Sequence, residues 1–327
     1  MRAANTVHHV LFDTREKRAS LTGVGGSSGS RTMMLRPLPA LVVRPGDPPR
    51  RPAFTLLELL VVMAILGVLA ALLLPALARA KNRAQAIACL SNQRQLGLAC
   101  LLYAGDYGDA LPYNLGDSET KSLVAEGRYL NWVNNVMSWD TDPDNTNTSL
   151  LQAGGLGPYC SGSVEIYRCP ADWVLSGDQR DAGWRARVRS LSMNALMGDA
   201  GEFTRWGTNV NVPGYRQYFR FDHIPEPSRL FVFIEEHPDS VDDGYFLNNP
   251  RVLEWHDLPA SYHGGLANLS YADGHVESHA WRSASTRQPA RPDVVPLPLA
   301  IPSSERRDFD WLMGRTSYLR RSPVGAD

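Results

Sequence analysis

One apolar stretch decides the fold, Phe54-Thr-Leu-Leu-Glu-Leu-Leu-Val-Val-Met-Ala-Ile-Leu-Gly-Val-Leu-Ala-Ala-Leu-Leu-Leu74. Its 21 residues carry a single charge, on Glu58. As an α-helix they would span about 30 Å, which is the thickness of the hydrocarbon core of a bilayer. The stretch therefore predicts a transmembrane helix.

The segments on the two sides of this stretch differ in charge. Residues 1–53 hold nine Arg and Lys against three acids, whereas the remainder has a net charge of −7, so the whole chain has −1. An excess of Arg and Lys marks the cytoplasmic side of a membrane span. We therefore expect a single pass through the inner membrane, with a basic, disordered leader over 1–53 in the cytoplasm and the body in the periplasm.

The helix is expected to continue beyond the membrane. Residues 76–103 are rich in good helix formers, so a transmembrane and stalk helix is predicted over 54–104. An apolar stripe on this helix comprises Leu77, Ala84, Ile87, Leu98 and Leu101. Such a stripe is typical of the face that a helix buries.

Short apolar runs separated by turn residues follow the helix. Strands are predicted at 187–193 and 230–234, and a hairpin joins 266–272 to 275–281 through Asp273-Gly274. Asp-Gly between alternating segments favours a two-residue type I′ turn. We therefore expect an α+β fold, with a head over 105–287 that contains an antiparallel sheet and a Pro-rich C-terminal extension over 288–327.

The two-residue turn fixes the register that we expect in the hairpin. The pairs are Ala272 with His275, Tyr271 with Val276, Ser270 with Glu277, Leu269 with Ser278 and Asn268 with His279. One face of the hairpin is then mostly apolar and faces a core. The other face, which includes Asn268 and Ser270, is expected to face solvent.

The junction between Ala53 and Phe54 carries a motif. The run Ala53-Phe-Thr-Leu-Leu-Glu58 behind a basic, proline-containing flank closely resembles the processing site of type IV prepilins and of type II secretion pseudopilins. The resemblance implies that prepilin peptidase removes the leader before Phe54 and methylates the new amine. It also implies that Glu58 pairs with the amine of a neighbouring subunit. Ala53 replaces the usual Gly, and its small side chain is expected to permit cleavage.

Further motifs resemble the large pilin-like proteins of planctomycetes and verrucomicrobia. They are Cys89-Leu-Ser-Asn-Gln-Arg-Gln-Leu-Gly97, Tyr103-Ala-Gly-Asp106, Cys169-Pro-Ala-Asp172, and His263 followed after nine residues by Asp273-Gly274. Members of that group share the prepilin stalk and a C-terminal His-x9-Asp-Gly signature. The resemblance therefore implies a pilin-like head.

These motifs lead to one interpretation and one alternative. We interpret the chain as a structural subunit of a type II secretion pseudopilus or of a type IV pilus-like filament. Its partners would be the membrane, prepilin peptidase and other pilin or pseudopilin subunits, in a homo- or hetero-oligomeric filament. The alternative is a membrane-anchored extracytoplasmic module that binds a polysaccharide or a protein and forms no filament.

The four cysteines leave two alternatives open. Disulfides form in extracytoplasmic proteins, so we favour a disulfide that involves Cys169, with Cys89 and Cys160 as candidate partners. Free thiols are the alternative. Neither Cys89 with Cys100 nor Cys160 with Cys169 has the CxxC spacing that is common in zinc sites.

Metal binding is not expected from the sequence. The C-terminal region holds His256, His263, Asp273, His275 and His279. Along a strand, His275 and His279 would stand about 13 Å apart, and a turn accounts for Asp273. His263 and Asp273 remain the candidate ligands.

Residues 140–147 could offer oxygens to calcium, but they lack the Gly and the closing Glu of an EF-hand, so a solvated loop is favoured. No cofactor is expected.

Other function classes lack their motifs. The string Gly25-Gly-Ser-Ser-Gly29 has the Gly-x-Ser-x-Gly spacing, but it lies in the basic leader and indicates a flexible linker. The sequence has no phosphate-binding loop and no His-Glu-x-x-His, so we do not expect an enzyme. Nucleic-acid binding favours a basic surface, whereas the body is acidic. Nucleic acid is therefore not expected as a partner.

Overall fold

The computed structural model describes residues 54–320. The predicted leader, including Ala53, lies outside the described residues. The chain divides into two compact units, residues 1–59 and residues 60–327.

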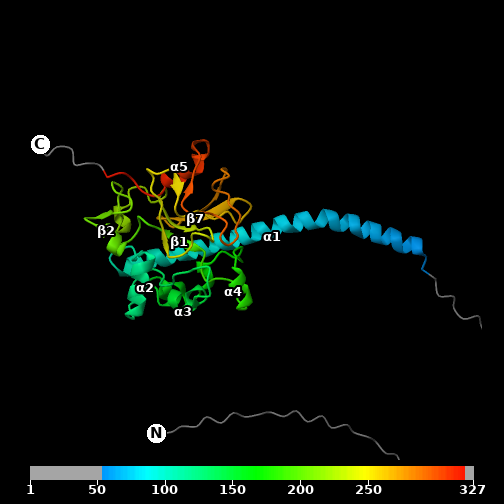
Figure 1. Ribbon diagram of the computed structural model, residues 1–327, viewed down its shortest axis with the longest axis horizontal. Coiled ribbons are helices and arrows are strands. Elements are labelled where there is room, and N and C mark those ends of the chain that lie inside the picture. Colours follow the sequence, from blue (N-terminus) through cyan, green and yellow to red (C-terminus); the bar gives the residue numbers. More distant parts are fainter. Residues whose placement is uncertain (1–53, 321–327) are drawn as a thin grey trace, which may run out of the picture. The chain divides into compact units, whose positions relative to one another are not determined.

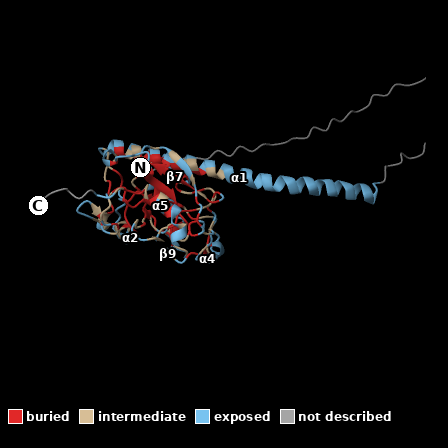
Figure 2. Ribbon diagram, turned by 90° about the horizontal axis from the view of Figure 1, so that it is seen from above, coloured by how far each residue is buried: buried red, intermediate tan, exposed pale blue. Residues whose placement is uncertain are grey.

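The long helix that the sequence predicts is present. Helix α1 spans Leu56–Asp106 and runs through Pro75 without interruption. Every residue from 56 to 84 is exposed, although most are apolar over the first five turns (Figure 2). Among the described residues, α1 is the one helix that is long and apolar enough to cross a membrane. A long apolar N-terminal helix followed by a sheet-rich region agrees with the expected α+β class.

A five-stranded sheet forms the centre of the head (Figure 1). The strand order is β5-β1-β4-β7-β8, and all neighbours are antiparallel except β1 and β5, which are parallel. The bounds are β1 Leu191–Asn194, β4 Phe231–Glu235, β5 Tyr245–Phe246, β7 Leu266–Tyr271 and β8 Val276–Ala280. The expected strand at 230–234 therefore corresponds to β4, while the expected strand at 187–193 is present only from Leu191.

Short elements complete the described chain. Two small antiparallel pairs join β2 (Thr204–Arg205) to β3 (Thr208–Asn209) and β6 (Glu254–Trp255) to β9 (Leu299–Ala300). The further α-helices are α2 Asp117–Ala125, α3 Thr148–Gln152, α4 Gly177–Asp181 and α5 Arg307–Met313. The 3-10 helices are Pro143–Asn145, Gly157–Cys160, Glu165–Tyr167, Gly201–Phe203, Phe221–His223 and Ser303–Glu305.

The hairpin between β7 and β8 forms, but the expected register is wrong by one residue. Leu269 pairs with Glu277, and Asn268 pairs with Ser278. The turn uses three residues, because the Gly274 amide donates to the Tyr271 carbonyl and Gly274 then adopts φ +84°. A type I turn followed by a left-handed glycine is the usual three-residue connection. The shift moves every β8 side chain to the opposite face.

The face of β7 that was expected to face solvent is buried by α1. The Gln93 side-chain amide donates to the Asn268 carbonyl at 2.8 Å. A Cβ placed on Gly97 would lie 3.7 Å from the Ser270 Cβ, so the helix backbone comes close to the strand. Asn268 and Ser270 are therefore fully buried, and the solvent face that we expected does not exist.

Most of the predicted apolar stripe of α1 does not contact the sheet. Leu77, Ala84, Ile87 and Leu98 are exposed, whereas Leu101 is half-buried beside the turn at Gly274. The buried residues of α1 are Cys89, Gln93, Leu96, Gly97, Ala99, Cys100 and Ala104. Small and polar residues dominate this face, so hydrophobicity alone does not identify it.

Two hydrophobic clusters lie in the head. The first contains residues from α1 and the sheet, with Leu96, Trp132 and Phe233 among its members. The second contains Phe231 and Leu269 together with Val295, Ile301 and three residues of α5, which are Phe309, Leu312 and Met313. The C-terminal segment therefore packs into the head through β9 and α5.

Candidate functional site

The N-terminal end of α1 holds the residues next to the prepilin-like junction. Phe54 is exposed at 72%. The Thr55 amide and hydroxyl donate to Glu58 Oε2 at 2.9 and 2.8 Å, and the Glu58 amide donates to Thr55 Oγ1 at 3.2 Å. This reciprocal arrangement is a capping box, which satisfies donors at a helix start. Glu58 thus has a partner within its own subunit.

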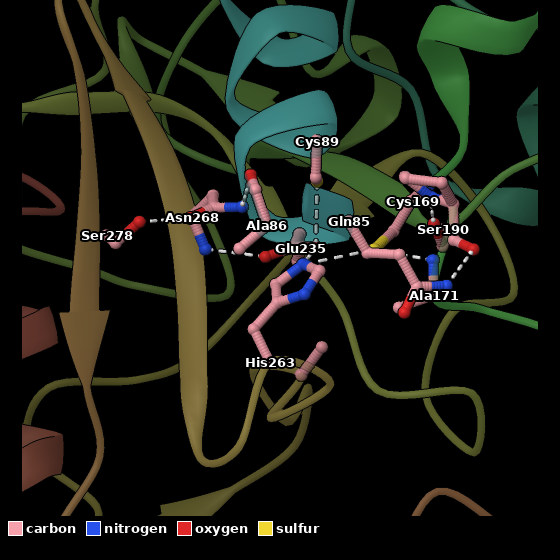
Figure 3. Close-up of polar contacts among 12 residues, drawn as sticks. Gln85, Ala86, Cys89, Cys169, Ala171, Ser190, Glu235, His263, Asn268 and Ser278 are labelled. Carbon is pink, nitrogen blue, oxygen red and sulfur yellow. Dashed lines mark hydrogen bonds and ion pairs between the residues drawn. The ribbon is translucent and has the colours of Figure 1, made fainter. Parts of the chain in front are cut away.

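A second group of chemically reactive side chains is buried in the head. Cys89, Cys169, Glu235 and His263 each offer one ligand atom, and these atoms all lie within 4.8 Å of one another (Figure 3). Their exposed fractions are 0% for Cys89, Cys169 and Glu235 and 5% for His263. We call these four residues the Cys-Glu-His cluster. Among the described residues, no other group of three or more such side chains meets this distance criterion.

The cluster is joined by short contacts. Cys89 Sγ donates to Glu235 Oε1 at 2.9 Å. The Nε2 atom of His263 lies 3.0 Å from the same oxygen and 3.2 Å from Cys169 Sγ. The carboxylate and the imidazole therefore form the centre of the cluster, with one sulfur beside each of them.

Four separate segments supply the cluster. Cys89 comes from α1, Cys169 from the loop after the 3-10 helix at 165–167, Glu235 from the last position of β4, and His263 from the loop before β7. Glu235 follows four apolar strand residues and points to the side of the sheet on which α1 lies, as Figure 3 shows. The sheet and α1 together determine where these side chains meet.

Backbone amides hold two of the cluster residues. The Asn268 amide donates to Glu235 Oε2 at 2.6 Å, and the Ala171 amide donates to Cys169 Sγ at 3.4 Å. The Cys169 amide in turn donates to the Ser190 hydroxyl at 2.6 Å. The second ring nitrogen of His263, Nδ1, is buried and has no hydrogen-bond partner in the described part of the chain.

Burial changes the acidity of these groups. It raises the pKa of the Cys89 thiol to about 11 and raises the pKa of Cys169 as well. Burial alone would lower the pKa of His263, but the contacts of the imidazole with Cys169 and Glu235 outweigh burial and raise its pKa to about 10.

The structure separates the two metal-ligand candidates that the sequence suggested. His263 belongs to the cluster, whereas Asp273 is exposed in the hairpin turn and accepts hydrogen bonds from the His275 amide and ring. His279 stacks on Trp311 in another part of the head. Sequence reasoning did not connect His263 with Cys89, Cys169 and Glu235. A signal was present for three of them, because Cys89, Cys169 and His263 each begin one of the resembling motifs.

The cysteines are free thiols in the structure. Cys160 lies outside the cluster, where its thiol donates to the Leu156 carbonyl at 3.1 Å. The disulfide at Cys169 stays a prediction. Of its two candidate partners, Cys89 lies in the cluster beside Cys169, and Cys160 does not.

The acidic loop at 140–147 uses its side chains in local turns. Asp142 caps the Asp144 amide, and Asn147 caps the Ser149 amide. The Asn145 side chain is buried and donates to two backbone carbonyls of the same loop. These contacts account for the local composition as turn chemistry.

Comparison with known proteins identifies the N-terminal region. A family model described as the prokaryotic N-terminal methylation motif matches residues 49–74. The chain carries a prepilin-type motif. Such a motif points to type IV pilin-like and pseudopilin-like proteins, and it implies processing by prepilin peptidase and pilin-type assembly in general. The motif and the apolar helix α1 are consistent with a single-pass membrane anchor. No curated protein and no solved structure matches the chain.

Proposed function

We propose that this chain is a structural subunit of a type II secretion pseudopilus or of a type IV pilus-like filament. Prepilin peptidase would cleave it between Ala53 and Phe54, and α1 would anchor it in the inner membrane with a pilin-like, non-catalytic head in the periplasm. The observation that carries the proposal is the methylation motif at the start of an exposed apolar helix. The shared Cys, Asp-Gly and His motifs further support assignment to the large planctomycete-type group.

The exposed surface of α1 supports membrane insertion. The large apolar side chains from Phe54 to Leu74 are 45–76% exposed. Each large apolar side chain moved from water to an apolar environment contributes about 1.5–3 kcal/mol, so this surface requires lipid or neighbouring helices. Contiguous exposed apolar surface of this extent marks an interaction site.

Glu58 has the geometry to take part in assembly. A carboxylate within the hydrocarbon costs about 2.5–3.5 kcal/mol on insertion scales, so an acid at this depth favours a cationic partner. Cleavage before Phe54 would create an amine at the same end of the helix. Both Thr55 hydrogen bonds go to Oε2 of Glu58. The second carboxylate oxygen can then accept from the amine of a neighbouring subunit.

N-terminal mass spectrometry tests the processing step. The full chain would be expressed in a host with prepilin peptidase and in a matched host that lacks the enzyme. The expected mature chain begins at Phe54 and carries one added methyl group only in the first host. A chain that still begins upstream of Phe54 in the first host refutes the proposal.

Two substitutions of Glu58 test assembly. Glu58→Gln keeps an oxygen that accepts from Thr55 but removes the charge, whereas Glu58→Ala removes both. If the charge pairs with a neighbouring amine, both variants are inserted and cleaved but fail to form filaments. Filaments of normal yield from Glu58→Gln would show that only the cap matters. If unsubstituted mature protein forms no filament, the chain is instead an anchored binding module.

A further inference from the structure

We propose that Cys89, Cys169, Glu235 and His263 form a structural zinc site that links α1 to the head. This proposal differs from the sequence-based expectation that the protein binds no metal or other cofactor. It does not depend on filament assembly, because it rests only on contacts within residues 60–320. Its first support is the convergence of four metal-ligating side chains from four segments.

The spacing of the ligand atoms suits a tetrahedral zinc ion. Bonds of about 2.3 Å to sulfur and about 2.0–2.2 Å to nitrogen or oxygen give tetrahedron edges of about 3.3–3.8 Å. The contacts that join the Cys-Glu-His cluster measure 2.9–3.2 Å, and no two ligand atoms lie more than 4.8 Å apart. These separations bracket the tetrahedral edges, so shifts of up to about 0.5 Å per ligand atom would seat the ion.

The donor set selects zinc among common cations. Two thiolates and an imidazole are soft or borderline ligands, which suit zinc and do not suit magnesium or calcium. The carboxylate of Glu235 completes four protein ligands. Because all four residues are buried, the site keeps no position open for substrate, and this is the pattern of structural rather than catalytic zinc.

Surrounding groups orient the ligands. The amide of Asn268 binds the Glu235 oxygen that faces away from the cluster, and the amide of Ala171 binds the Cys169 sulfur. Partners of this kind fix the direction of metal ligands and raise metal affinity. Asn268 also binds α1, because its side-chain amide contacts the Ala86 carbonyl at 3.4 Å and its own carbonyl accepts from Gln93.

The position of the site gives zinc a defined role. Cys89 lies on α1, while the other three ligands lie on the sheet and on two loops of the head. An ion here would connect the helix to three segments that are distant in the sequence. It would also balance the charge of two thiolates and a carboxylate, which are costly to bury unpaired. Zinc would therefore stabilise the attachment of α1 to the sheet.

Metal analysis of the full chain in detergent, purified without chelator, tests the proposal. We expect about one equivalent of zinc per chain. After removal of zinc, added Co²⁺ should give the visible bands of tetrahedral coordination and near-ultraviolet bands from thiolate ligation. The Co²⁺ spectrum requires no substitution, so it reports on the site even if a variant fails to fold.

Matched cysteine variants locate the ion. Cys169→Ser removes a proposed ligand, and Cys160→Ser changes another buried thiol that lies outside the cluster. Outer-shell changes weaken metal binding about 10–100-fold, so the loss of Cys169 should weaken zinc binding by more than about 100-fold. Cys160→Ser should bind zinc as the unsubstituted chain does.

Three results would overturn the proposal. The first is an unsubstituted chain that holds no zinc and gives no thiolate band with Co²⁺. The second is equal zinc content in the unsubstituted chain and in Cys169→Ser, which would indicate adventitious binding. The third is a Cys89–Cys169 disulfide found by peptide mass mapping in the freshly purified chain.

Discussion

Replacing Leu96 with alanine is expected to destabilise the head strongly, whereas the same change at Leu98 should have almost no effect. Leu96 is 0% exposed in the first hydrophobic cluster, and Leu98, two residues later on α1, is 54% exposed. Removing three buried carbons costs about 0.8 kcal/mol for each one in transfer free energy. The residual cavity brings the total for Leu96→Ala to about 3–4 kcal/mol.

Thermal unfolding of the full chain in detergent measures the difference. For a domain of about 250 residues, each kcal/mol lowers the Tm by about 2–4 °C, so Leu96→Ala should lower it by about 6–16 °C. Leu98→Ala is a surface change, whose effect should remain within about 0.5 kcal/mol. Equal losses in the two variants, or a larger loss at Leu98, would show that α1 contacts the sheet through a different face.

Three further predictions concern turns and buried acids. Gly274→Ala should cost about 1–2 kcal/mol in urea denaturation, because φ is +84° and the new Cβ would lie 3.1 Å from Leu101. Trp206→Asn should stabilise the head by about 0.5–1 kcal/mol in the same assay, because Trp206 is 93% exposed with φ +54°, which Asn tolerates better. Burial, followed by repulsion from neighbouring acids, raises the pKa of Asp243 and Asp257 well above the usual value. The folded chain therefore keeps protons that the unfolded chain releases above about pH 4, so the Tm should fall from pH 5 to pH 8, and Asp243→Asn should reduce that fall.

Elements with a local signal could be predicted from the sequence. The length and composition of 54–74 are sufficient for a membrane-spanning helix, because the bilayer thickness sets the required length. The run at 230–234 also corresponds to β4, because a short uninterrupted apolar run is typical of a strand that is buried on both faces. These inferences need no knowledge of distant segments.

The register of the hairpin depends on whether the turn has two or three residues, and the composition of the turn does not determine this. Asp273-Gly274 supports a two-residue turn when both residues adopt positive φ. In the structure only Gly274 does, and Ala272 and Asp273 form the preceding type I turn. The one-residue difference reverses the faces of β8, so Glu277 rather than Ser278 lies opposite Leu269.

The Cys-Glu-His cluster could not be found by spacing rules. Such rules detect ligands that lie close in sequence, such as CxxC, where one turn of chain presents both side chains. Here the two ligands closest in sequence, Glu235 and His263, are separated by a segment that contains β5 and β6, and Cys89 belongs to α1. The packing of α1 on β7 brings Cys89 to the other three residues, which meet through contacts of His263 with Glu235 and Cys169.

The apolar stripe predicted on α1 gains a different meaning in the structure. At about 100° per residue, Leu77, Ile87 and Leu98 lie on the side roughly opposite to the buried face that holds Gln93 and Cys100. The helix therefore contacts its own head through small and polar groups, and it leaves its larger apolar residues exposed. A helix that served only its own head would be more stable with these residues buried. Their outward position favours packing against the stalks of neighbouring subunits, which is what the proposed filament requires.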